Sequence, residues 1–375
     1  MAIIAGRGVA TGRPVSDVAS GRNNNDVSQR EDLANFISMI TRDETPFMSS
    51  IGKTKATAIY HEWQTDELQQ PGNSRITEGT DYVLPGGTQL SGGETQHTGD
   101  EFNVVGPFRS RLGNYTQING KTIAVSGTRR AIDQAGVADE YAYQLKKRGT
   151  ELRRDIEFDL IHSYNVASAT NSGTASRSLG GYQAWINVAS GNTVDGRGAG
   201  FGTVELNGAT IDPANQGIGT HVPVLTGSRV PLSLADIDGV MQRIYQEGGK
   251  ATKIMLSPKL RRDFSDLMVT DSGVRRNIDM DGKLRQSVDI YMSDFGDLMV
   301  VPNYIMGLAH TVGGQQIADS SALVYDPMWF SIATLRPLQE VDVGQRGDST
   351  VGMMVEECSL EVKNPIGCGA IYNLA

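Results

Sequence analysis

Residues 139–163, DEYAYQLKKRGTELRRDIEFDLIHS, carry the pattern that decides the fold. Apolar side chains recur there at steps of three or four residues or their sums, which is the spacing of one helix face. They are Tyr141, Leu145, Leu152, Ile156 and Leu160. The opposite side is charged, and its members are Lys146, Lys147, Arg148, Glu151, Arg153, Arg154, Asp155 and Glu157. We therefore expect a long helix whose polar face is solvated or paired. The helix would be about 38 Å long, and a sheet or a neighbouring subunit must lie along it to bury its narrow apolar stripe.

The totals fit a water-soluble chain with room for two domains. The sequence has 375 residues, 39% of them hydrophobic, and a mean hydropathy of -0.28. No apolar run approaches the ~18 residues of a membrane-spanning helix, and the apolar run near the N-terminus is too short for a signal peptide. The only cysteines, Cys358 and Cys368, cannot form a disulfide framework and suit a reducing cytoplasm. A net charge of -9 argues against tight, sequence-independent binding of nucleic acid by the whole surface.

Glycine is concentrated in two long stretches, about 70–113 and 180–227, where large apolar residues are sparse. Structureless loops of such length are uncommon in compact domains unless they carry function or become ordered on a partner. Residues 1–30 also lack a usable period and indicate an extended arm. The glycines at 196, 198, 200 and 202 are expected to form a flexible loop, because no helix pattern follows them.

The rest of the chain alternates helix and strand signals. Helices are expected from Leu33 to Ile40, after residue 126 with Gly136 as a stop, and from Ser233 with a capping box and a Gly248-Gly249 stop. Strands are expected at 56–63, 114–126 and 253–256, and at two runs around a turn in 287–303. Ser257-Pro258 should begin a helix, and two long strands separated by GQRGDS should close the chain. The fold class is therefore α+β, with a small α/β layer in the middle.

Motifs for chemistry are weak throughout. The GKT triplets at 52–54 and 120–122 lack the first glycine of a phosphate loop. The DFG triplet at 294–296 has no other kinase motif beside it, which favours a tight turn, and DMDG at 279–282 places its glycine too early for a calcium loop. The five histidines have no ligand spacing. We expect no catalytic residue, no metal, no cofactor and no enzyme activity.

Several blocks resemble the major capsid proteins of tailed bacteriophages, the branch also called major head proteins. They are EDLANFISMITRDETPFMSSIGKTKATAIYHEWQTDEL (31–68), NYTQINGKTIAVSGTRRAIDQAG (114–136), YAYQLKKRGTELRRDIEFDLI (141–161), SLADIDGVMQRIYQEGG (233–249), VDIYMSDFGDLMVVPN (288–303) and VEECSLEVKNPIG (355–367). Together, and in this order, these blocks cover most of the chain beyond residue 31. The resemblance implies the tailed-phage capsid fold, which encapsulins and the herpesvirus capsid floor share.

The resemblance implies a division of the chain. It comprises an N-terminal arm (1–45), an extended hairpin loop (64–112), a peripheral domain (46–63, 113–186 and 331–375) with a spine helix (137–164), a glycine-rich insertion loop (187–232) and an axial α/β domain (233–330). The implied function is a structural shell protein that self-assembles into pentamers and hexamers around double-stranded DNA, without sequence-specific binding or a membrane. Scaffolding, portal and decoration proteins are further implied partners, and the virion, assembled in the host cytoplasm, is the implied location. An encapsulin-like compartment and a monomeric binding module are the alternatives.

The residues expected to matter for assembly lie on the spine helix. They are Tyr141, Leu145, Gly149, Leu152, Arg153, Arg154, Ile156 and Leu160. The apolar members should lie on the long strands, while Lys146, Arg153 and Arg154 should face the shell surface or a neighbour. Gly149 either packs closely against a strand or marks a bend point. Some members of this fold join a loop lysine to a neighbour's asparagine, but no lysine occurs here between Lys55 and Lys121, which predicts a non-covalent shell.

Overall fold

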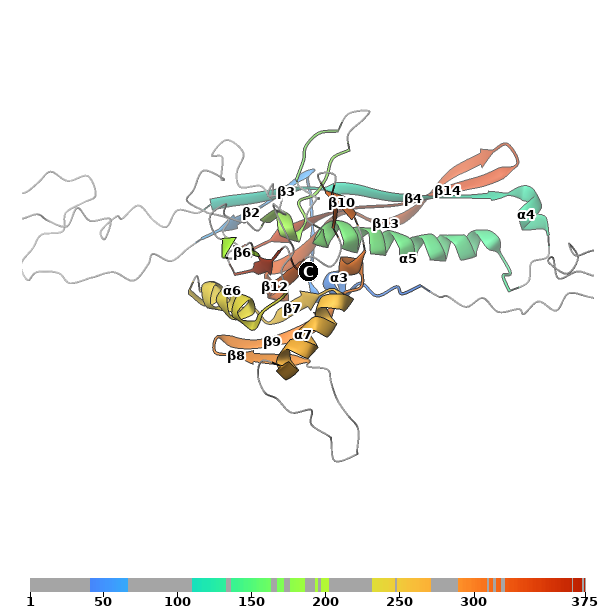
Figure 1. Cartoon of the computed structure of the whole chain (residues 1–375). Helices are drawn as coiled ribbons and strands as arrows, with labels where there is room; N and C mark the ends of the chain where they lie inside the picture. The colour runs from blue at the N-terminus through green and yellow to red at the C-terminus, as the bar shows by residue number, and fades with distance from the viewer. Residues whose placement is uncertain are drawn as a thin grey trace, which may run out of the picture.

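The computed structural model describes residues 41–66, 110–132, 136–162, 167–171, 176–185, 193–194, 197–201, 231–246, 248–270, 289–308, 310–312, 315–317, 321–365, 367–372 and 374. Long strands and one long helix form its upper part in Figure 1, and a sheet of shorter strands with two helices forms its lower part. The expected helix at 33–40, with the rest of residues 1–40, lies outside these ranges, as does segment 67–109. The elements that can be placed confirm the α+β class.

The upper sheet has four strands in the order β1-β13-β14-β4. β13 (Phe330–Arg346) and β14 (Ser349–Val362) are antiparallel and meet at a turn where Gly347 has a φ of 62°, a conformation that favours glycine. β4 (Gln117–Ser126) pairs antiparallel with β14, and β1 (Gly52–Lys55) pairs parallel with β13. The prediction of two long strands around GQRGDS is confirmed.

The upper part also contains shorter elements. β2 (Tyr60–Thr65) and β3 (Ser110–Tyr115) pair antiparallel, although the first of these strands was expected to begin at residue 56. The helices are α3 (Pro46–Ser50), α4 (Gly127–Ala131), α5 (Glu140–Ile161) and the 3-10 turn η2 (Tyr182–Trp185). The expected stop at Gly136 is wrong, because Ile132 already has an extended backbone with a ψ of 135° and ends α4 there.

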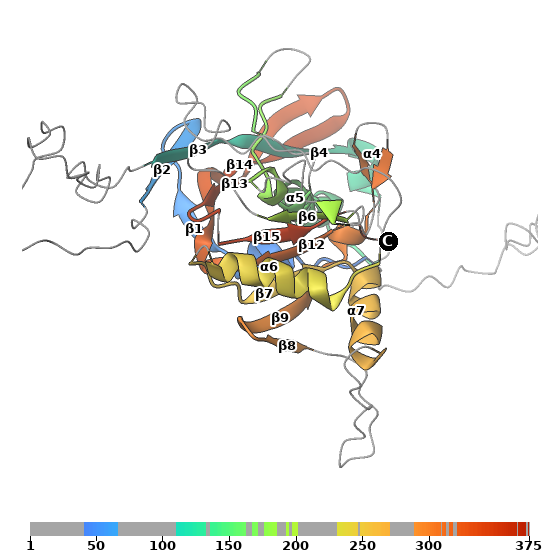
Figure 2. The same cartoon turned by 60° about the vertical axis from the view of Figure 1, so that its left-hand side comes forward.

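The lower sheet has seven strands in the order β5-β6-β15-β12-β7-β9-β8. Its bounds are β5 (Thr193–Val194), β6 (Arg197–Phe201), β7 (Lys253–Leu256), β8 (Ile290–Ser293), β9 (Gly296–Pro302), β12 (Ala322–Tyr325) and β15 (Gly369–Ile371). The helices α6 (Leu234–Gln246) and α7 (Pro258–Thr270) lie beside it (Figure 2). Smaller elements are β10 (His310–Val312), β11 (Gln315–Ile317), η3 (Ile305–Gly307) and η4 (Pro327–Trp329).

Local signals for this lower part are confirmed. The Ser233 hydroxyl accepts from the Asp236 N–H at 3.3 Å, while the Asp236 carboxylate accepts from the Ser233 N–H at 3.2 Å, which is a capping box. Gly248 has a φ of 78° and follows the end of α6. The Ser257 hydroxyl accepts from the Leu260 N–H at 3.3 Å, so it caps α7. Asp294 and Phe295 of the DFG triplet form the turn between β8 and β9, and Gly296 begins β9.

One expectation for the glycine-rich stretch is wrong. Residues 197–201 form β6 rather than a flexible loop, and Gly200 pairs with Ala370 of β15. The edge of β15 supplies the hydrogen-bonding partner that local sequence cannot show, and a partner strand can order a segment that has little strand propensity of its own. Residues 186–192 and 202–230 lie outside the described ranges.

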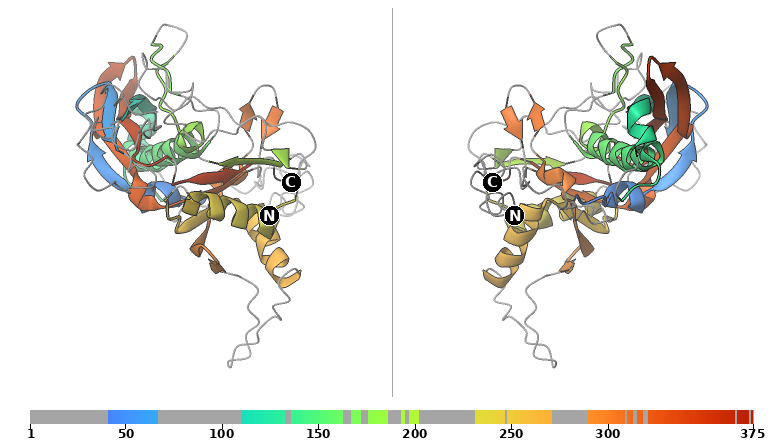
Figure 3. Two further views of the ribbon diagram at one scale, coloured as in Figure 1. Left: turned by 90° about the vertical axis from the view of Figure 1, so that its left-hand side faces the viewer. Right: turned by 90° about the vertical axis from the view of Figure 1, so that its right-hand side faces the viewer.

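Two apolar cores lie on opposite faces of the lower sheet. The first core joins α5, the upper sheet and the face that carries Met255, Leu323 and Tyr325. The second core joins α6 and α7 to the other face, which carries Ile254 and Leu256. Figure 3 shows the sheets and helices that enclose these cores edge-on. The division into arm, loop, peripheral and axial parts remains a prediction, and the lower sheet includes β5, β6 and β15 as well as strands of 233–330.

Among the described helices, none combines the length and the apolar character that crossing a membrane requires.

Candidate functional site

Helix α5 is the element on which the candidate assembly residues lie. Its 22 residues begin after Asp139, whose side chain accepts from the Tyr141 N–H at 2.9 Å and caps the helix. The helix runs beside β4 and β14 (Figure 1). Leu152, Ile156 and Leu160 are buried in the first core, and Leu145 packs against that core while partly exposed. The apolar stripe is therefore covered by the chain's own strands.

Tyr141 lies at the N-terminal end of this stripe and contacts the distal half of the β13–β14 hairpin. Its hydroxyl donates to the Glu340 carboxylate at 2.7 Å. This hydrogen bond is the largest cause of a rise in the pKa of Tyr141 to about 12, and burial is the second cause. A methyl group on Gly352 of β14 would stand only 2.0 Å from the same hydroxyl. The absence of a side chain at Gly352 therefore makes room for Tyr141.

Gly149 lies against β14, and the contact is with a flexible side chain. A Cβ added to Gly149 would meet Met354 Cε at 3.2 Å, with no backbone atom among its near neighbours. α5 continues through this position without interruption. This geometry favours close packing over a bend point.

We expect Gly149→Ala to change the free energy of unfolding by less than about 1 kcal/mol, since the gain in helix propensity offsets a small shift of Met354. Thermal melting and the yield of assembled particles provide the measurement. A variant that forms a precursor shell but does not expand would contradict the packing interpretation and support a bend.

The two arginines of the candidate set point to different surroundings. Arg153 is exposed. Burial raises the pKa of the Glu356 carboxyl on β14, and the positive charges of Arg153 and Lys53 lower that pKa in part. Arg154 is partly buried, and its guanidinium lies 5.5 Å from the centre of the Tyr304 ring. In the single chain Tyr304, just before η3, lies against that side of α5, and the contact of Arg154 with a neighbour or the shell surface stays a prediction.

Glu157 corrects the expectation of a wholly solvated or paired polar face on this helix. It was expected on the solvated face, yet it is 0% exposed. Its Oε1 accepts from the Phe47 N–H at 2.8 Å and from Asn303 Nδ2 at 2.9 Å, and its Oε2 accepts from the Met48 N–H at 2.6 Å. Burial raises the pKa of Glu157 to about 7, against the lowering effect of these three donors. The packing of α3 and Asn303 against the C-terminal half of α5 explains why one polar position is internal.

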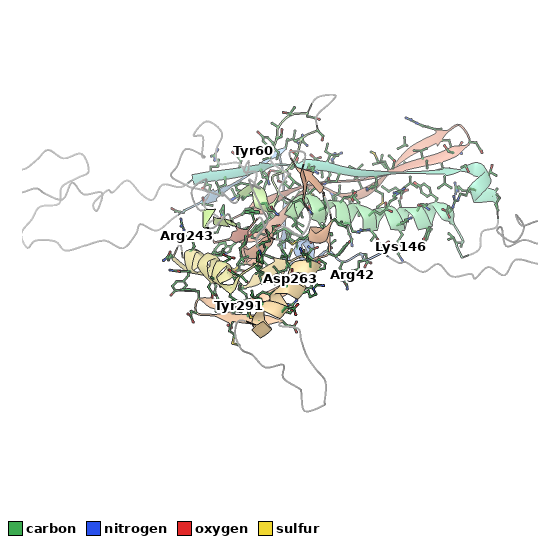
Figure 4. The ribbon with its side chains drawn as sticks, viewed as in Figure 1. Arg42, Tyr60, Lys146, Arg243, Asp263 and Tyr291 are labelled. Atoms are coloured by element: carbon green, nitrogen blue, oxygen red, sulfur yellow. The ribbon has the colours of Figure 1, made fainter. Side chains whose placement is uncertain are left out.

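The N-terminal half of α5 keeps an exposed polar face. Lys146 is labelled in Figure 4 on the side of the helix away from β4, and it is exposed. Some other charges on the helix are paired: Lys121 of β4 forms an ion pair with Asp155, and Arg148 bonds Glu151 at 2.6 Å. Lys146 is exposed in the single chain, and its contact with a neighbour or the shell surface stays a prediction.

A second candidate surface was not found by sequence reasoning. Ile290, Met292 and Met299 are 57%, 75% and 54% exposed, and together they form what we call the β8–β9 face. Ile290 and Met299 are direct partners across the two strands. Side chains alternate along a strand, and Tyr291 points the other way, toward Phe264 of α7 and Asp238 of α6. Figure 4 labels Tyr291 there. The sequence feature that could have indicated this surface is a strand with apolar residues on both of its faces, at the edge of a sheet.

We find no metal-binding site and no reactive thiol among the residues that the structure describes. Those residues contain no group of three or more His, Cys, Asp or Glu side chains that could hold a metal ion. Cys358 and Cys368 are buried, and burial raises both thiol pKa values well above the usual range. A protonated, inaccessible thiol is a poor nucleophile. The surfaces described above are therefore the candidates for function.

A protein family and a curated phage protein are similar to this chain in sequence. The model of a family described as SU10 major capsid protein matches residues 19–375. The major capsid protein of Escherichia phage Phieco32 is 27% identical over 266 residues, which are 66% of this chain and 68% of that protein.

Solved capsids share the fold at low sequence identity. The capsid of a native GTA particle has a TM-score of 0.51 at 13% identity and covers 96% of this chain and 98% of its own. The mature capsid of bacteriophage PhiM1 has a TM-score of 0.52 at 10% identity and covers 93% of each chain. These structures confirm the expected capsid fold. The chain therefore belongs to the SU10 major capsid protein family, as a phage major capsid protein that forms the capsid shell.

Proposed function

We propose that copies of this chain assemble into pentamers and hexamers, which close into an icosahedral or prolate head around a double-stranded DNA genome. The observation that carries the proposal is the family match over residues 19–375. The role is structural, without catalysis or a cofactor, and scaffolding, portal and decoration proteins are its proposed accessory partners. Assembly takes place in the host cytoplasm. The phage capsid protein among the relatives favours a genome container over an encapsulin-like compartment.

The proposed architecture gives each part of the chain a task. The predicted arm (1–45), extended loop (64–112) and insertion loop (187–232) contact neighbouring subunits in the shell. α5 and the upper sheet form the peripheral framework, whereas strands of 233–330 with α6 and α7 form the axial part. Each contact between copies repeats many times in a closed shell, so weak contacts suffice.

Negative-stain microscopy of the purified chain tests this function. Uniform shells, rings or tubes are the expected result. Nuclease-resistant DNA inside particles recovered from infected cells would identify a genome container, and a protein cargo would identify a compartment instead. Dispersed monomers at all concentrations and salt conditions would contradict the proposal.

The β8–β9 face is a proposed contact between copies. Exposed apolar side chains in contiguous positions mark interaction surfaces, and a shell protein meets other copies of itself. We expect Met292→Lys to reduce particle yield at least tenfold while it leaves the melting temperature nearly unchanged, because the side chain is mostly solvated in the single chain.

Met328→Lys is the matched control, since Met328 is 66% exposed on η4 and lies outside the β8–β9 face. Particle yield by sedimentation and melting by circular dichroism are the two readouts. Equal yields for the two variants would remove the β8–β9 face from the set of contacts.

The shell is expected to be non-covalent. Because no lysine lies between Lys55 and Lys121, the proposed extended loop cannot supply an amine for a cross-link to a neighbour. Particles boiled in detergent should give a single electrophoretic band near the chain mass of 40.4 kDa. A ladder of multimers would overturn this expectation.

A further inference from the structure

Arg336 of β13 belongs to a group of charged side chains whose charges do not sum to zero. Its Nε donates to Oε2 of Glu357 on β14 at 2.7 Å. The other carboxylate oxygen, Oε1, accepts from Arg177 and, at 2.8 Å, from the Thr116 hydroxyl. The side chains of Arg177 and Glu357 are 10% and 5% exposed, whereas that of Arg336 is 45% exposed. Since the buried pair is already neutral, Arg336 adds one surplus positive charge at the surface.

The guanidinium group of Arg336 is held in place through a single nitrogen. The pairing of β13 with β14 shifts on both sides of this residue, between Thr334 and Arg336 and between Arg336 and Gln339. Such irregularities re-aim a side chain from its regular direction on a strand. Within the described part of the chain, the contact with Glu357 is the one hydrogen bond or ion pair of the Arg336 side chain. Its terminal nitrogens, Nη1 and Nη2, are therefore open to another acceptor.

The sheet face around Arg336 is exposed and partly apolar. Arg336 pairs with Glu357, which pairs with Ile118 of β4, so these three side chains share one face. Ile118 is 52% exposed, and the alternate residues of β4 are buried toward α5. Among the described strands, β1 pairs with β13 only as far as Thr334, so the outer edge of β13 beyond that residue has no strand beside it. The face turned away from α5 is therefore accessible at Arg336.

We propose that Arg336 binds a carboxylate of a second copy of this chain, with Ile118 as the apolar part of the same contact. A guanidinium group offers parallel N–H donors that match the two oxygens of a carboxylate. Arginine beside apolar side chains is typical of the centre of a protein interface. The chain has 43 acidic and 34 basic side chains, so other copies are rich in the matching group. The inference rests on the proposed function, because copies must meet in a shell.

Carbodiimide cross-linking of assembled particles tests this contact. Arg336→Lys places an amine at the position, and the reagent joins an amine to an adjacent carboxylate as an amide, with loss of water. Unlabelled variant chains are assembled with an excess of wild-type chains that carry a heavy isotope of nitrogen, and the linked peptides are identified by mass spectrometry. We expect an unlabelled peptide that spans position 336 to be joined to a labelled acidic peptide. Such a hybrid can come only from two copies.

Particle yield is the second measurement. Arg336→Ala should lower the yield of sedimenting particles about tenfold or more. Its melting temperature should change by about 3 °C or less, because Arg177 and Thr116 still bind Glu357. Arg346→Ala is the matched control, since it removes the same charge from an exposed position of the same strand, and its yield should stay within about twofold of wild type.

Three results would overturn the proposal. One is a set of particles in which position 336 is linked to Glu357 of the same chain and to no labelled peptide, which would leave the shell function intact and make Arg336 a solvated charge at the edge of β13. Another is a link from position 336 to a different protein alone. The third is an equal yield for Arg336→Ala and Arg346→Ala. If the wild-type chain forms no particles, the proposed function fails and this contact fails with it.

Discussion

Leu152→Asp is expected to prevent the chain from folding to a stable state. Leu152 is 1% exposed and lies in the first core between α5 and the strands. The substitution removes apolar contacts and places a carboxylate where water cannot reach it, at a cost of roughly 4 kcal/mol or more. Domains have about 5–15 kcal/mol of stability in total, so this loss is a large fraction of it. Soluble yield and thermal melting by circular dichroism are the measurements.

Lys146→Asp is the control on the same helix. Lys146 is exposed, and its replacement should lower the free energy of unfolding by less than about 1 kcal/mol. The two variants are compared by melting temperature and not by particle yield, because Lys146 is also proposed to face the shell surface or a neighbour. A wild-type melting curve for Leu152→Asp would show that the stripe does not lie in a core.

Gly181→Ala is expected to be the most damaging of the glycine substitutions. A Cβ at Gly181 would stand 2.6 Å from the Asp159 carbonyl oxygen and 3.1 Å from that of Leu160. Both atoms belong to the backbone of α5, so relief requires a shift of the helix or of the chain before η2. We expect a loss of about 2–4 kcal/mol in the free energy of unfolding, measured by denaturant titration.

Gly239→Ala provides the matched comparison for that prediction. Gly239 lies in α6, and an added Cβ would meet no atom within 4 Å. Alanine should stabilise the helix there by up to about 1 kcal/mol. The two variants should therefore shift the denaturation midpoint in opposite directions. Equal shifts would mean that the close approach of Gly181 to α5 does not limit the packing.

Local chemistry made the lower part of the fold predictable from the sequence. Ser233 and Asp236 form the expected capping box, and Ser257 and Pro258 begin α7 as expected. The length of α5 was also predictable, because it depends on a spacing repeated within 25 residues or so of chain. In each case the deciding residues are close in sequence.

Long-range partners decided what could not be predicted. Glu157 looked solvated because its neighbours on the helix are charged, whereas the donors that bind it are more than 100 residues away. β6 is a strand because β15 lies beside it, although glycine has low strand propensity. The β8–β9 face was missed for another reason: a single strand's pattern does not show which face the helices cover.

The position of the last strands constrains how the protein is made. β14 lies between β13 and β4, and β15 lies between β6 and β12, so neither sheet is complete before residues 349–371 are synthesised. On the ribosome, α5 and β4 emerge more than 180 residues before the strand that covers them. A nascent chain therefore cannot present a finished subunit.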